Sequence, residues 1–222
     1  MIMSEFDQSQ KEFWSGTTNL RAYDHPVVEA FARQRVDFVR GLLDAPIQTC
    51  LEVGCGDGFG MFYMQSLGRV FGCDISRPML RRNPLRQSVA EADIYRLPYA
   101  DKSFDLVYCW EVLHHVKDMQ GAIREMMRVS RHFILLYEPN AFNPLQVGFG
   151  LIAPSELGTL RFHPWFMRNH FRRAGLTHIR TFTVGAFTPN RTPVWLYKIL
   201  AALPYRIPLF GISNLAVARV TS

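Results

Sequence analysis

The segment CLEVGCGDGFG, residues 50–60, places an acid ahead of three alternate glycines: Glu52, Gly54, Gly56 and Gly58. Glycine costs stability inside regular structure, so a dense cluster indicates either a structural turn with positive φ or a backbone that lies close to a ligand. A turn between a strand and a helix N-terminus is typical of nucleotide-cofactor sites. The dinucleotide pattern G-x-G-x-x-G fits in neither register, because Phe59 or Met61 stands where the third glycine belongs. This mismatch disfavours a nicotinamide dehydrogenase.

Two aspartates follow at positions suited to binding an adenosine. Asp74 ends an apolar segment, 18 residues after Gly56. A carboxylate accepts two charge-assisted hydrogen bonds, so an acid at the end of a second strand can hold a ribose diol. Asp93 closes the next predicted strand, where its oxygens can accept a hydrogen bond from an adenine amino group. We therefore expect both aspartates in a cofactor site.

These motifs resemble those of class I S-adenosylmethionine-dependent methyltransferases, and of the type 11 methyltransferase family in particular. The acid with alternate glycines resembles the first motif of the class. The stretch ADIYRLPYADKSFDLV, residues 92–107, is the more specific match, with an acid, a Leu-Pro loop and Ser-Phe-Asp ahead of a strand. The stretch CWEVLHHVKD, residues 109–118, resembles the segment that lines the cofactor and the methyl-transfer site. The resemblance covers about residues 20–140.

The resemblance implies S-adenosylmethionine as the cofactor, with S-adenosylhomocysteine as its product. It assigns the cofactor contacts to Glu52, Gly54, Gly56, Gly58, Asp74, Ile75, Asp93, Ile94, Trp110, Glu111 and Tyr23. Ile94 would lie beside the base, and Trp110 and Glu111 beside the ribose and methionine parts. Tyr23 belongs to the segment RAYD, which resembles an N-terminal Tyr segment that closes over the methionine end.

The candidates for acid–base chemistry are two histidines and a glutamate. Methyl transfer from a sulfonium is an in-line displacement, so the protein mainly aligns the acceptor with the methyl group. A base is needed only for an alcohol, a phenol or a protonated amine. His114 and His115 follow the fourth predicted strand, and Glu138 closes the fifth. The alternative for the histidines is packing against the next helix. The four cysteines lack metal-ligand spacing, so we expect no metal site.

Strands alternate with helices through the first 140 residues. We expect strands at residues 49–54, 69–76, 88–93, from 104 onward, 131–138, 177–187 and 212–220, and helices at 26–43, 59–67, 78–83, 119–130 and 163–175. The alternation predicts an α/β fold with a doubly wound, mostly parallel Rossmann-like sheet and helices on both faces. The family resemblance adds a seven-stranded sheet with an antiparallel last strand. Ligands of such sheets bind at the carboxyl ends of the strands, where the candidates lie.

We expect a single domain over residues 1–222, since this length suits one domain. It would comprise an N-terminal helical cap at 1–45, a cofactor-binding core at 46–140, and a substrate part at 141–222 that holds the last two strands. Between these two strands, residues 188–211 form an apolar insertion with four prolines. We expect a helical lid over the acceptor there. A core element and a helix that touches membrane lipid are the alternatives.

The composition is compatible with an anionic partner. The net charge is +6, and the stretch from Arg161 to Arg180 has five Arg, three His and no acid. The four cysteines are those expected of buried thiols in a reducing cytoplasm. The N-terminus has no basic start followed by an apolar run, and no segment has the roughly 20 apolar residues of a membrane span. We therefore expect a cytoplasmic protein with, at most, peripheral membrane contact.

We predict in-line methyl transfer from S-adenosylmethionine to a small-molecule acceptor. The stretch at residues 138–167 resembles a subgroup of enzymes linked to lipid and glycan metabolism, so the acceptor would be lipid-like or glycan-linked, and apolar or anionic. One alternative is an RNA methyltransferase, although nucleic acid is disfavoured because the segment after the fourth strand lacks the Asn/Asp-Pro-Pro-aromatic motif. Another is a non-catalytic adenosylmethionine-binding partner protein. The sequence does not indicate an oligomeric state.

Overall fold

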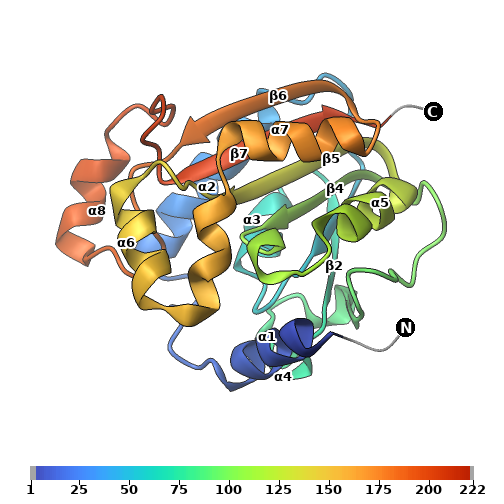
Figure 1. Cartoon of the computed structure of the whole chain (residues 1–222), viewed down its shortest axis with the longest axis horizontal. Coiled ribbons are helices and arrows are strands. Elements are labelled where there is room, and N and C mark those ends of the chain that lie inside the picture. The colour runs from blue at the N-terminus through green and yellow to red at the C-terminus, as the bar shows by residue number, and fades with distance from the viewer. Residues whose placement is uncertain (1–3, 221–222) are drawn as a thin grey trace.

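A seven-stranded sheet with the order β3-β2-β1-β4-β5-β7-β6 forms the centre of the computed structural model, which describes residues 4–220 (Figure 1). The strands are β1 (Thr49–Val53), β2 (Arg69–Asp74), β3 (Val89–Glu91), β4 (Phe104–Trp110), β5 (Ser130–Pro139), β6 (Thr177–Val184) and β7 (Ser213–Arg219). Strands β1 to β5 pair in parallel, whereas β7 is antiparallel to both β5 and β6. The predicted fold class is confirmed.

The strand order reverses between β1 and β4, which pair in parallel with Leu51 opposite Val107. Ligands of open α/β sheets bind at such a switch point, outside the carboxyl ends of the strands. Strand β4 is buried along its whole length, as expected for a parallel strand with helices on both faces. The candidate segments at residues 54–58 and 110–115 follow β1 and β4 directly, so the fold brings them together.

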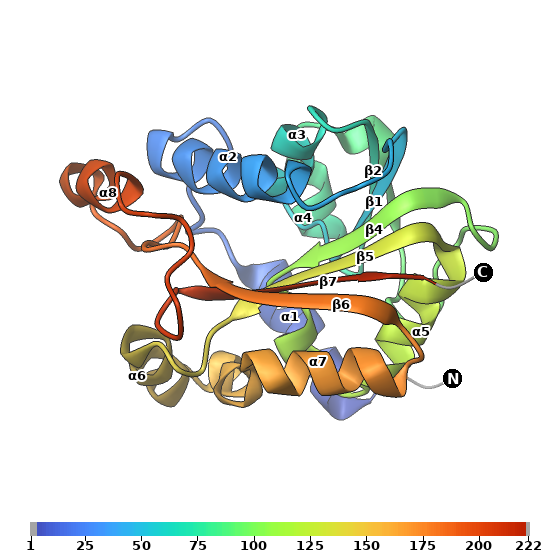
Figure 2. The same cartoon turned by 90° about the horizontal axis from the view of Figure 1, so that it is seen from above.

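Helices cover both faces of the sheet, with α2, α3 and α4 on one side and α5 and α7 on the other (Figure 2). The helices are α1 (Glu5–Gly16), α2 (Pro26–Arg40), α3 (Phe59–Met64), α4 (Arg77–Arg82), α5 (Met119–Val129), α6 (Pro144–Ile152), α7 (Pro164–Arg173) and α8 (Val194–Ala201), with 3-10 turns η1 (Arg86–Ser88), η2 (Leu113–His115) and η3 (Pro154–Arg161). On α5 the buried Ile123 and Met126 pack in the core. Burial of each such side chain contributes about 1.5–3 kcal/mol.

Two helices, α1 and α6, are absent from the sequence-based prediction. Helix α1 begins after Ser4, whose hydroxyl accepts a hydrogen bond from the Asp7 amide. An acid three residues after a serine resembles a capping box, so the sequence contained a local signal for the start of this helix. Helix α6 begins after Asn143, which caps the amides of Leu145 and Gln146. Its sequence is apolar nearly all round, so it lacks the periodicity that indicates a helix face.

The insertion between β6 and β7 contains α8, which packs on α2. Tyr197 and Leu200 of α8 pack against a buried cluster of Val27, Phe31 and Phe187. The Gln34 side chain donates a hydrogen bond to the Ala201 carbonyl at 2.9 Å. The rest of α8 faces solvent, and Trp195 is 72% exposed. None of the helices within residues 4–220 is long and apolar enough to span a bilayer.

Candidate active site

Three adjoining cavities lie at the carboxyl ends of the strands. The inner cavity, about 90 Å³, is bordered by Gly54, Asp74, Ile75, Asp93, Ile94, Val112 and His115. The central cavity, about 160 Å³, is bordered by Trp14, Leu20, Glu52, Gly54, Gly56, Asp74, Trp110, Glu111, Val112 and His115. The outer cavity, about 140 Å³, is bordered by Trp14, Leu20, Glu111, His114, His115, Gln146, Phe149, Glu156 and Arg191. Shared lining residues make the three cavities neighbours along one path.

A larger hollow, about 820 Å³, lies beside α7, β6 and β7. Its lining includes Arg168, Arg172, Arg180 and Arg219. None of the predicted site residues borders it, and it shares no lining residue with the three cavities. Its size therefore does not make it the candidate active site.

The glycine loop after β1 needs backbone conformations that other residues avoid. Gly54, Gly56 and Gly58 have φ of +73°, +48° and +82°. A Cβ on Gly54 would lie 2.6 Å from Val112, and one on Gly58 would lie 2.2 Å from the Asn83 Oδ1. A Cβ on Gly56 would lie 3.1 Å from the flexible end of Met79 and 4.0 Å from the Asp74 Oδ2, and Gly56 borders the central cavity. Gly58 borders none of the three cavities, so its requirement is structural.

Asp74 is oriented by the backbone at the end of β2. Its Oδ2 accepts a hydrogen bond from the Gly56 amide at 2.9 Å, and its Oδ1 accepts one from the Ser76 amide at 2.7 Å. Burial raises the pKa of Asp74, and these amide bonds oppose that effect. Each carboxylate oxygen has a second lone-pair direction, so Asp74 can still accept two hydroxyl groups from the cavity.

Asp93 and Ile94 border the inner cavity, together with Ile75 after β2. The Asp93 Oδ1 accepts a hydrogen bond from the Tyr95 amide at 3.0 Å, which orients the carboxylate. The Ile75 and Ile94 side chains give this cavity apolar surface. An adenine base, with a flat apolar face and an amino group, matches this combination of groups.

Glu52 lies beneath the glycine loop. Burial raises its pKa to about 8, although a hydrogen bond from the Tyr108 hydroxyl at 2.8 Å opposes the shift. A Cβ on Gly60 would lie 2.5 Å from the Glu52 Oε1, so the first turn of α3 rests on this side chain. The contact supports a role for Glu52 in holding the loop.

Trp110 and Glu111 follow the end of β4. Glu111 takes a positive φ of 59°, and its carboxylate pairs with the buried Arg35. The Arg35 guanidinium also stacks on Phe31 and Tyr137 at 4.0 and 4.4 Å from the ring centroids. The buried Trp110 Nε1 has no hydrogen-bond partner among residues 4–220. A buried donor without a partner beside a cavity suits a polar ligand.

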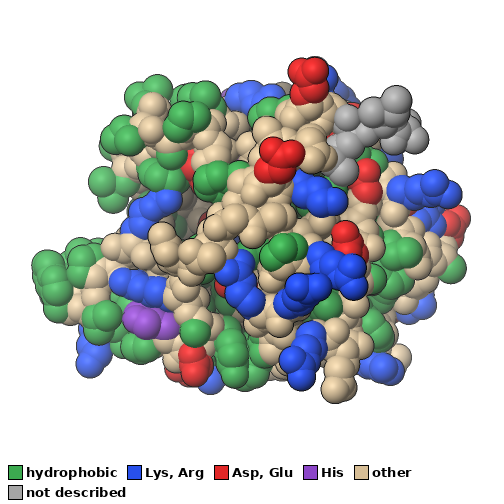
Figure 3. Space-filling model, turned by 90° about the horizontal axis from the view of Figure 1, so that it is seen from below, with side chains coloured by type: hydrophobic (Ala, Val, Ile, Leu, Met, Phe, Trp, Pro, Cys, Tyr) green, Lys and Arg blue, Asp and Glu red, His purple; other side chains and the backbone are tan. Residues whose placement is uncertain are grey.

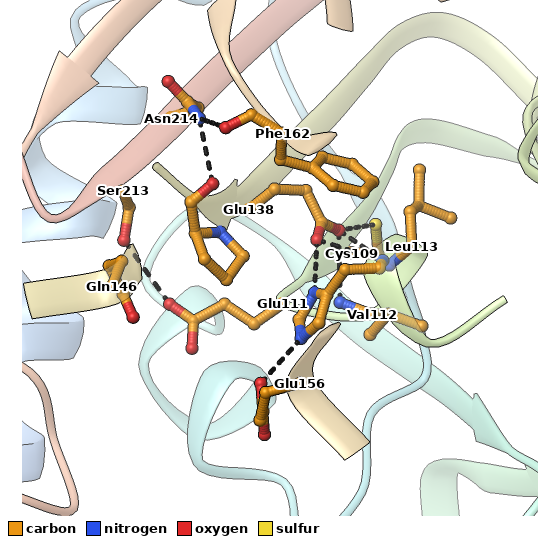
Figure 4. Close-up of polar contacts among 12 residues, drawn as sticks. Cys109, Glu111, Val112, Leu113, Glu138, Gln146, Glu156, Phe162, Ser213 and Asn214 are labelled. Atoms are coloured by element: carbon orange, nitrogen blue, oxygen red, sulfur yellow. Dashed lines mark hydrogen bonds and ion pairs between the residues drawn. The ribbon is translucent and has the colours of Figure 1, made fainter. Parts of the chain in front are cut away.

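Glu138 and Glu156 lie on opposite sides of one imidazole ring, that of His114 (Figure 4). The His114 Nδ1 lies 2.7 Å from the Glu138 Oε2, and its Nε2 lies 3.3 Å from the Glu156 Oε2. Glu138 also accepts hydrogen bonds from the amides of Val112, Leu113 and His114 at 3.1, 2.7 and 3.3 Å. Glu138 therefore holds the turn η2 together.

The two histidines differ in protonation. Burial by itself lowers the pKa of His114, but the hydrogen bonds to Glu138 and Glu156 outweigh burial and raise it to about 9. Burial and the neighbouring His114 charge lower the pKa of His115 well below its ordinary value. Near neutral pH, His114 is an imidazolium between two carboxylates and His115 is neutral. The His115 Nδ1 has no hydrogen-bond partner among residues 4–220.

Residues 51–132 match the model of a family described as a methyltransferase domain. A solved S-adenosylmethionine-dependent methyltransferase from Thermotoga maritima superposes with a TM-score of 0.67 at 16% identity, over 86% of this chain and 89% of that one. Magnesium protoporphyrin IX methyltransferase from Synechocystis PCC 6803, solved with S-adenosylmethionine, gives 0.61 at 15% identity over the full length of both chains. The chain contains a methyltransferase domain at residues 51–132, and the two solved structures share its fold.

A curated relative of the methyltransferase domain is the 27-O-demethylrifamycin SV methyltransferase of Amycolatopsis mediterranei. It is 30% identical over 169 residues, which are 65% of this chain and 58% of the relative. The chain spans about half the length of the curated relatives it matches. The methyltransferase family predicted from the motifs is confirmed over residues 51–132, and the solved protein from Synechocystis has S-adenosylmethionine bound.

Most of the predicted site residues lie along the cavities, but Gly58, Glu138 and Tyr23 border none of the three. The Tyr23 ring packs on Phe62 at 4.5 Å between centroids, and Tyr23 borders none of the three cavities. Helix α1 lies over the site instead, with Gln10 bordering the inner cavity and Trp14 the central and outer ones. The capping signal at Ser4 could have indicated this helix, but not its position over the cavities.

The insertion also differs from the expected lid. Pro189 and Asn190 border the central and outer cavities, and Arg191 borders the outer one. The side chains of Trp195 and Ile199, which we expected over the acceptor, are 72% and 62% exposed to solvent. The loop ahead of α8 therefore borders the site, whereas α8 does not cover it, because its covered face is used against α2.

Proposed function

We propose that the methyltransferase domain binds S-adenosylmethionine along the inner and central cavities and transfers its methyl group to a small molecule in the outer cavity. The observation that carries this proposal is the continuity of the three cavities from Asp93, past the glycine loop and Asp74, to Glu111 and His115. Adenine, ribose, methionine and acceptor would occupy this path in order.

The residues present suit the cofactor. Asp93, Ile94 and Ile75 would hold the adenine, and Asp74 the ribose diol. The exposed backbone at Gly56 would let the cofactor approach closely. Glu111, Trp110 and the loop held by Glu52 would face the ribose and methionine parts. When bound, the cofactor supplies a methyl group already activated by its sulfonium.

On the acceptor side, we propose Glu156 as the base. It borders the outer cavity, and its side chain is 14% exposed, whereas the Glu138 side chain is fully buried. Its carboxylate would take the proton of an acceptor hydroxyl as the oxygen–methyl bond forms and the methyl–sulfur electron pair stays on sulfur. The predicted base candidates then take other roles: Glu138 and His114 position Glu156, and the neutral His115 contacts the acceptor.

The acceptor that suits the outer cavity combines an apolar body with a polar reacting end. Phe149, Leu20 and Trp14 provide apolar surface, and Gln146 and Glu156 provide polar groups. Relatives named for the methylation of demethylrifamycin and of malonyl-[acyl-carrier protein] support a small acceptor. The separate position of the arginine-lined hollow gives an RNA acceptor less support.

Calorimetric titration with S-adenosylhomocysteine tests the cofactor assignment. Asp74→Ala should weaken binding at least ~100-fold, because two charge-assisted hydrogen bonds of about 1.5–3 kcal/mol each are lost. Asp37→Ala, an exposed acid on α2, is the control and should bind like the wild type. Unchanged affinity in folded Asp74→Ala would contradict the assignment, and binding of NADH in place of the cofactor would contradict the function.

The base assignment is tested by transfer of tritiated methyl groups from S-adenosylmethionine into small-molecule extracts. Glu156→Gln should keep cofactor affinity and lower turnover by about 10²–10⁴-fold for a hydroxyl acceptor. Turnover should recover in Glu156→Gln as the pH rises toward the pKa of the acceptor hydroxyl. A variant with wild-type turnover at neutral pH would exclude Glu156 as the base.

A further inference from the structure

Exposed apolar side chains gather on α6, on α8 and on the segment between α8 and β7. The set is Leu145, Leu151, Ile152, Val194, Trp195, Ile199, Leu203, Leu209 and Phe210. Ile152 is 82% exposed and Phe210 59%. Scattered apolar residues are normal on a protein surface, but such a concentration marks a surface that contacts another molecule or a membrane.

These elements surround the mouth of the outer cavity. Helix α6 contributes Phe149 to its lining, and the loop ahead of α8 contributes Arg191, whose guanidinium carbon lies 3.1 Å from the Phe149 ring centroid. The Asn143 side chain donates a hydrogen bond to the Phe210 carbonyl at 2.7 Å, which places the later segment beside the start of α6.

The apolar elements stand on two sides of this mouth. Figure 2 shows α6 and α8 at the same end of the sheet, on its opposite sides. Figure 3 shows hydrophobic side chains in two groups at the left end of the molecule, with a recess between them. A flat apolar layer that touched both groups would cover the mouth of the outer cavity.

The segments that carry this surface have positive charges and no acid. Residues 144–152 contain no charged residue, and residues 188–212 contain three basic residues and no Asp or Glu. Arg191, Lys198 and Arg206 lie in the loop ahead of α8, in α8 itself and in the segment after it. A protein partner is usually recognised through both signs of charge, whereas basic residues beside projecting Trp and Leu side chains are typical of contact with anionic lipid.

We propose that α6, α8 and the segment at residues 203–210 dock this protein on an anionic lipid bilayer, and that its acceptor is an amphiphile held in that bilayer. The acceptor's role rests on the proposed methyl transfer. The apolar part of the acceptor lies between α6 and α8, and its polar end enters the outer cavity toward Glu156. Trp195 then lies at the headgroup level, where tryptophan is enriched in membrane proteins.

Sedimentation with lipid vesicles tests the docking surface in the full chain without any enzymatic assay. The vesicles are phosphatidylcholine alone and phosphatidylcholine with phosphatidylglycerol at about 3:1. We expect binding to the anionic vesicles, with a partition coefficient at least tenfold above that for the neutral ones. Brominated lipid should quench tryptophan fluorescence, and Trp195→Phe should remove most of that quenching.

Two double variants remove the apolar contacts, one on each helix. Trp195→Ser with Ile199→Ser on α8, and Leu151→Ser with Ile152→Ser on α6, should each lower the partition coefficient at least tenfold. Lys198→Gln should lower binding to anionic vesicles about fivefold, the factor for one basic residue near such a surface. Phe6→Ser is the matched control, because Phe6 is an exposed aromatic residue on α1, outside this surface.

Absence of vesicle binding by the wild type would overturn the proposal. So would vesicle binding that survives both double variants. If instead the wild type is a dimer in size-exclusion chromatography and the double variants are monomers that bind no vesicles, the surface joins two copies of the chain. Each variant should bind S-adenosylhomocysteine like the wild type. If the wild type itself does not bind S-adenosylhomocysteine, the proposed function is contradicted, but the result of vesicle binding is unaffected.

Discussion

Glu138→Gln tests the buried pair of Glu138 and His114 most directly. The substitution keeps the shape of the side chain but replaces one acceptor oxygen by an NH₂ donor. In the best orientation of the glutamine, its oxygen keeps the hydrogen bonds from the amides of Val112 and Leu113, which lie 3.1 and 2.7 Å from Oε1 in the wild type. The NH₂ group then faces the His114 amide and the His114 Nδ1, which both donate when the ring is protonated. The imidazolium loses the closer of its two partners and keeps Glu156.

The magnitude follows from the pKa of His114, about 9 in the folded protein against an ordinary 6.5. A folded pKa above the unfolded one stabilises the protein fully below pH 6.5, and this stability is lost as the pH rises through 9. At pH 7 the contribution is about 3 kcal/mol. Glu138→Gln should remove most of it, in line with the cost of breaking a buried ion pair. For a chain of this size, that loss lowers Tm by roughly 10 °C.

Thermal melts between pH 7 and pH 10 provide the assay. The wild type should lose about 3 kcal/mol across this range as His114 loses its proton, whereas Glu138→Gln should lack most of that component. Glu125→Gln is the control, because Glu125 also pairs with a basic residue, Arg128, and accepts a hydrogen bond from the Leu97 amide. The pKa of Glu125 is lowered, so the effect of this substitution on stability should be constant between pH 7 and pH 10. A variant that melts within about 3 °C of the wild type at pH 7, with a parallel pH profile, would refute the reasoning.

Two further predictions concern the cofactor half of the site. Gly58→Ala should lower the free energy of unfolding by about 1–3 kcal/mol, because φ is +82° and Asn83 occupies the Cβ position. Gly148→Ala on α6 is the control, since its Cβ would meet open space and should not destabilise the protein. Urea unfolding measures both variants. Trp14→Ala should weaken S-adenosylhomocysteine binding about tenfold, because Trp14 borders the central cavity and its ring packs on His115 at 5.2 Å between centroids. A calorimetric affinity equal to that of the wild type would show that α1 does not cover the cofactor.

The cofactor half of the site could be predicted from the sequence because its signals are local. The positions of Asp74 and Asp93 follow from where strands end, and the parallel pairing forced by alternating strands and helices brings such ends together. The glycine loop is likewise a turn between adjacent elements. The structure added that Gly58 is required by Asn83, whereas Gly54 and Gly56 border the central cavity.

The acceptor half was decided by the tertiary structure. Glu156 pairs with a histidine 42 positions earlier in the chain, and no periodicity or spacing encodes a contact between two such segments. Helix α8 is apolar nearly all round, so its sequence could not indicate which face packs on α2 and which leaves Trp195 in solvent. Local propensity determines where helices and strands form, but long-range packing determines which side chains share a cavity and which remain at the surface.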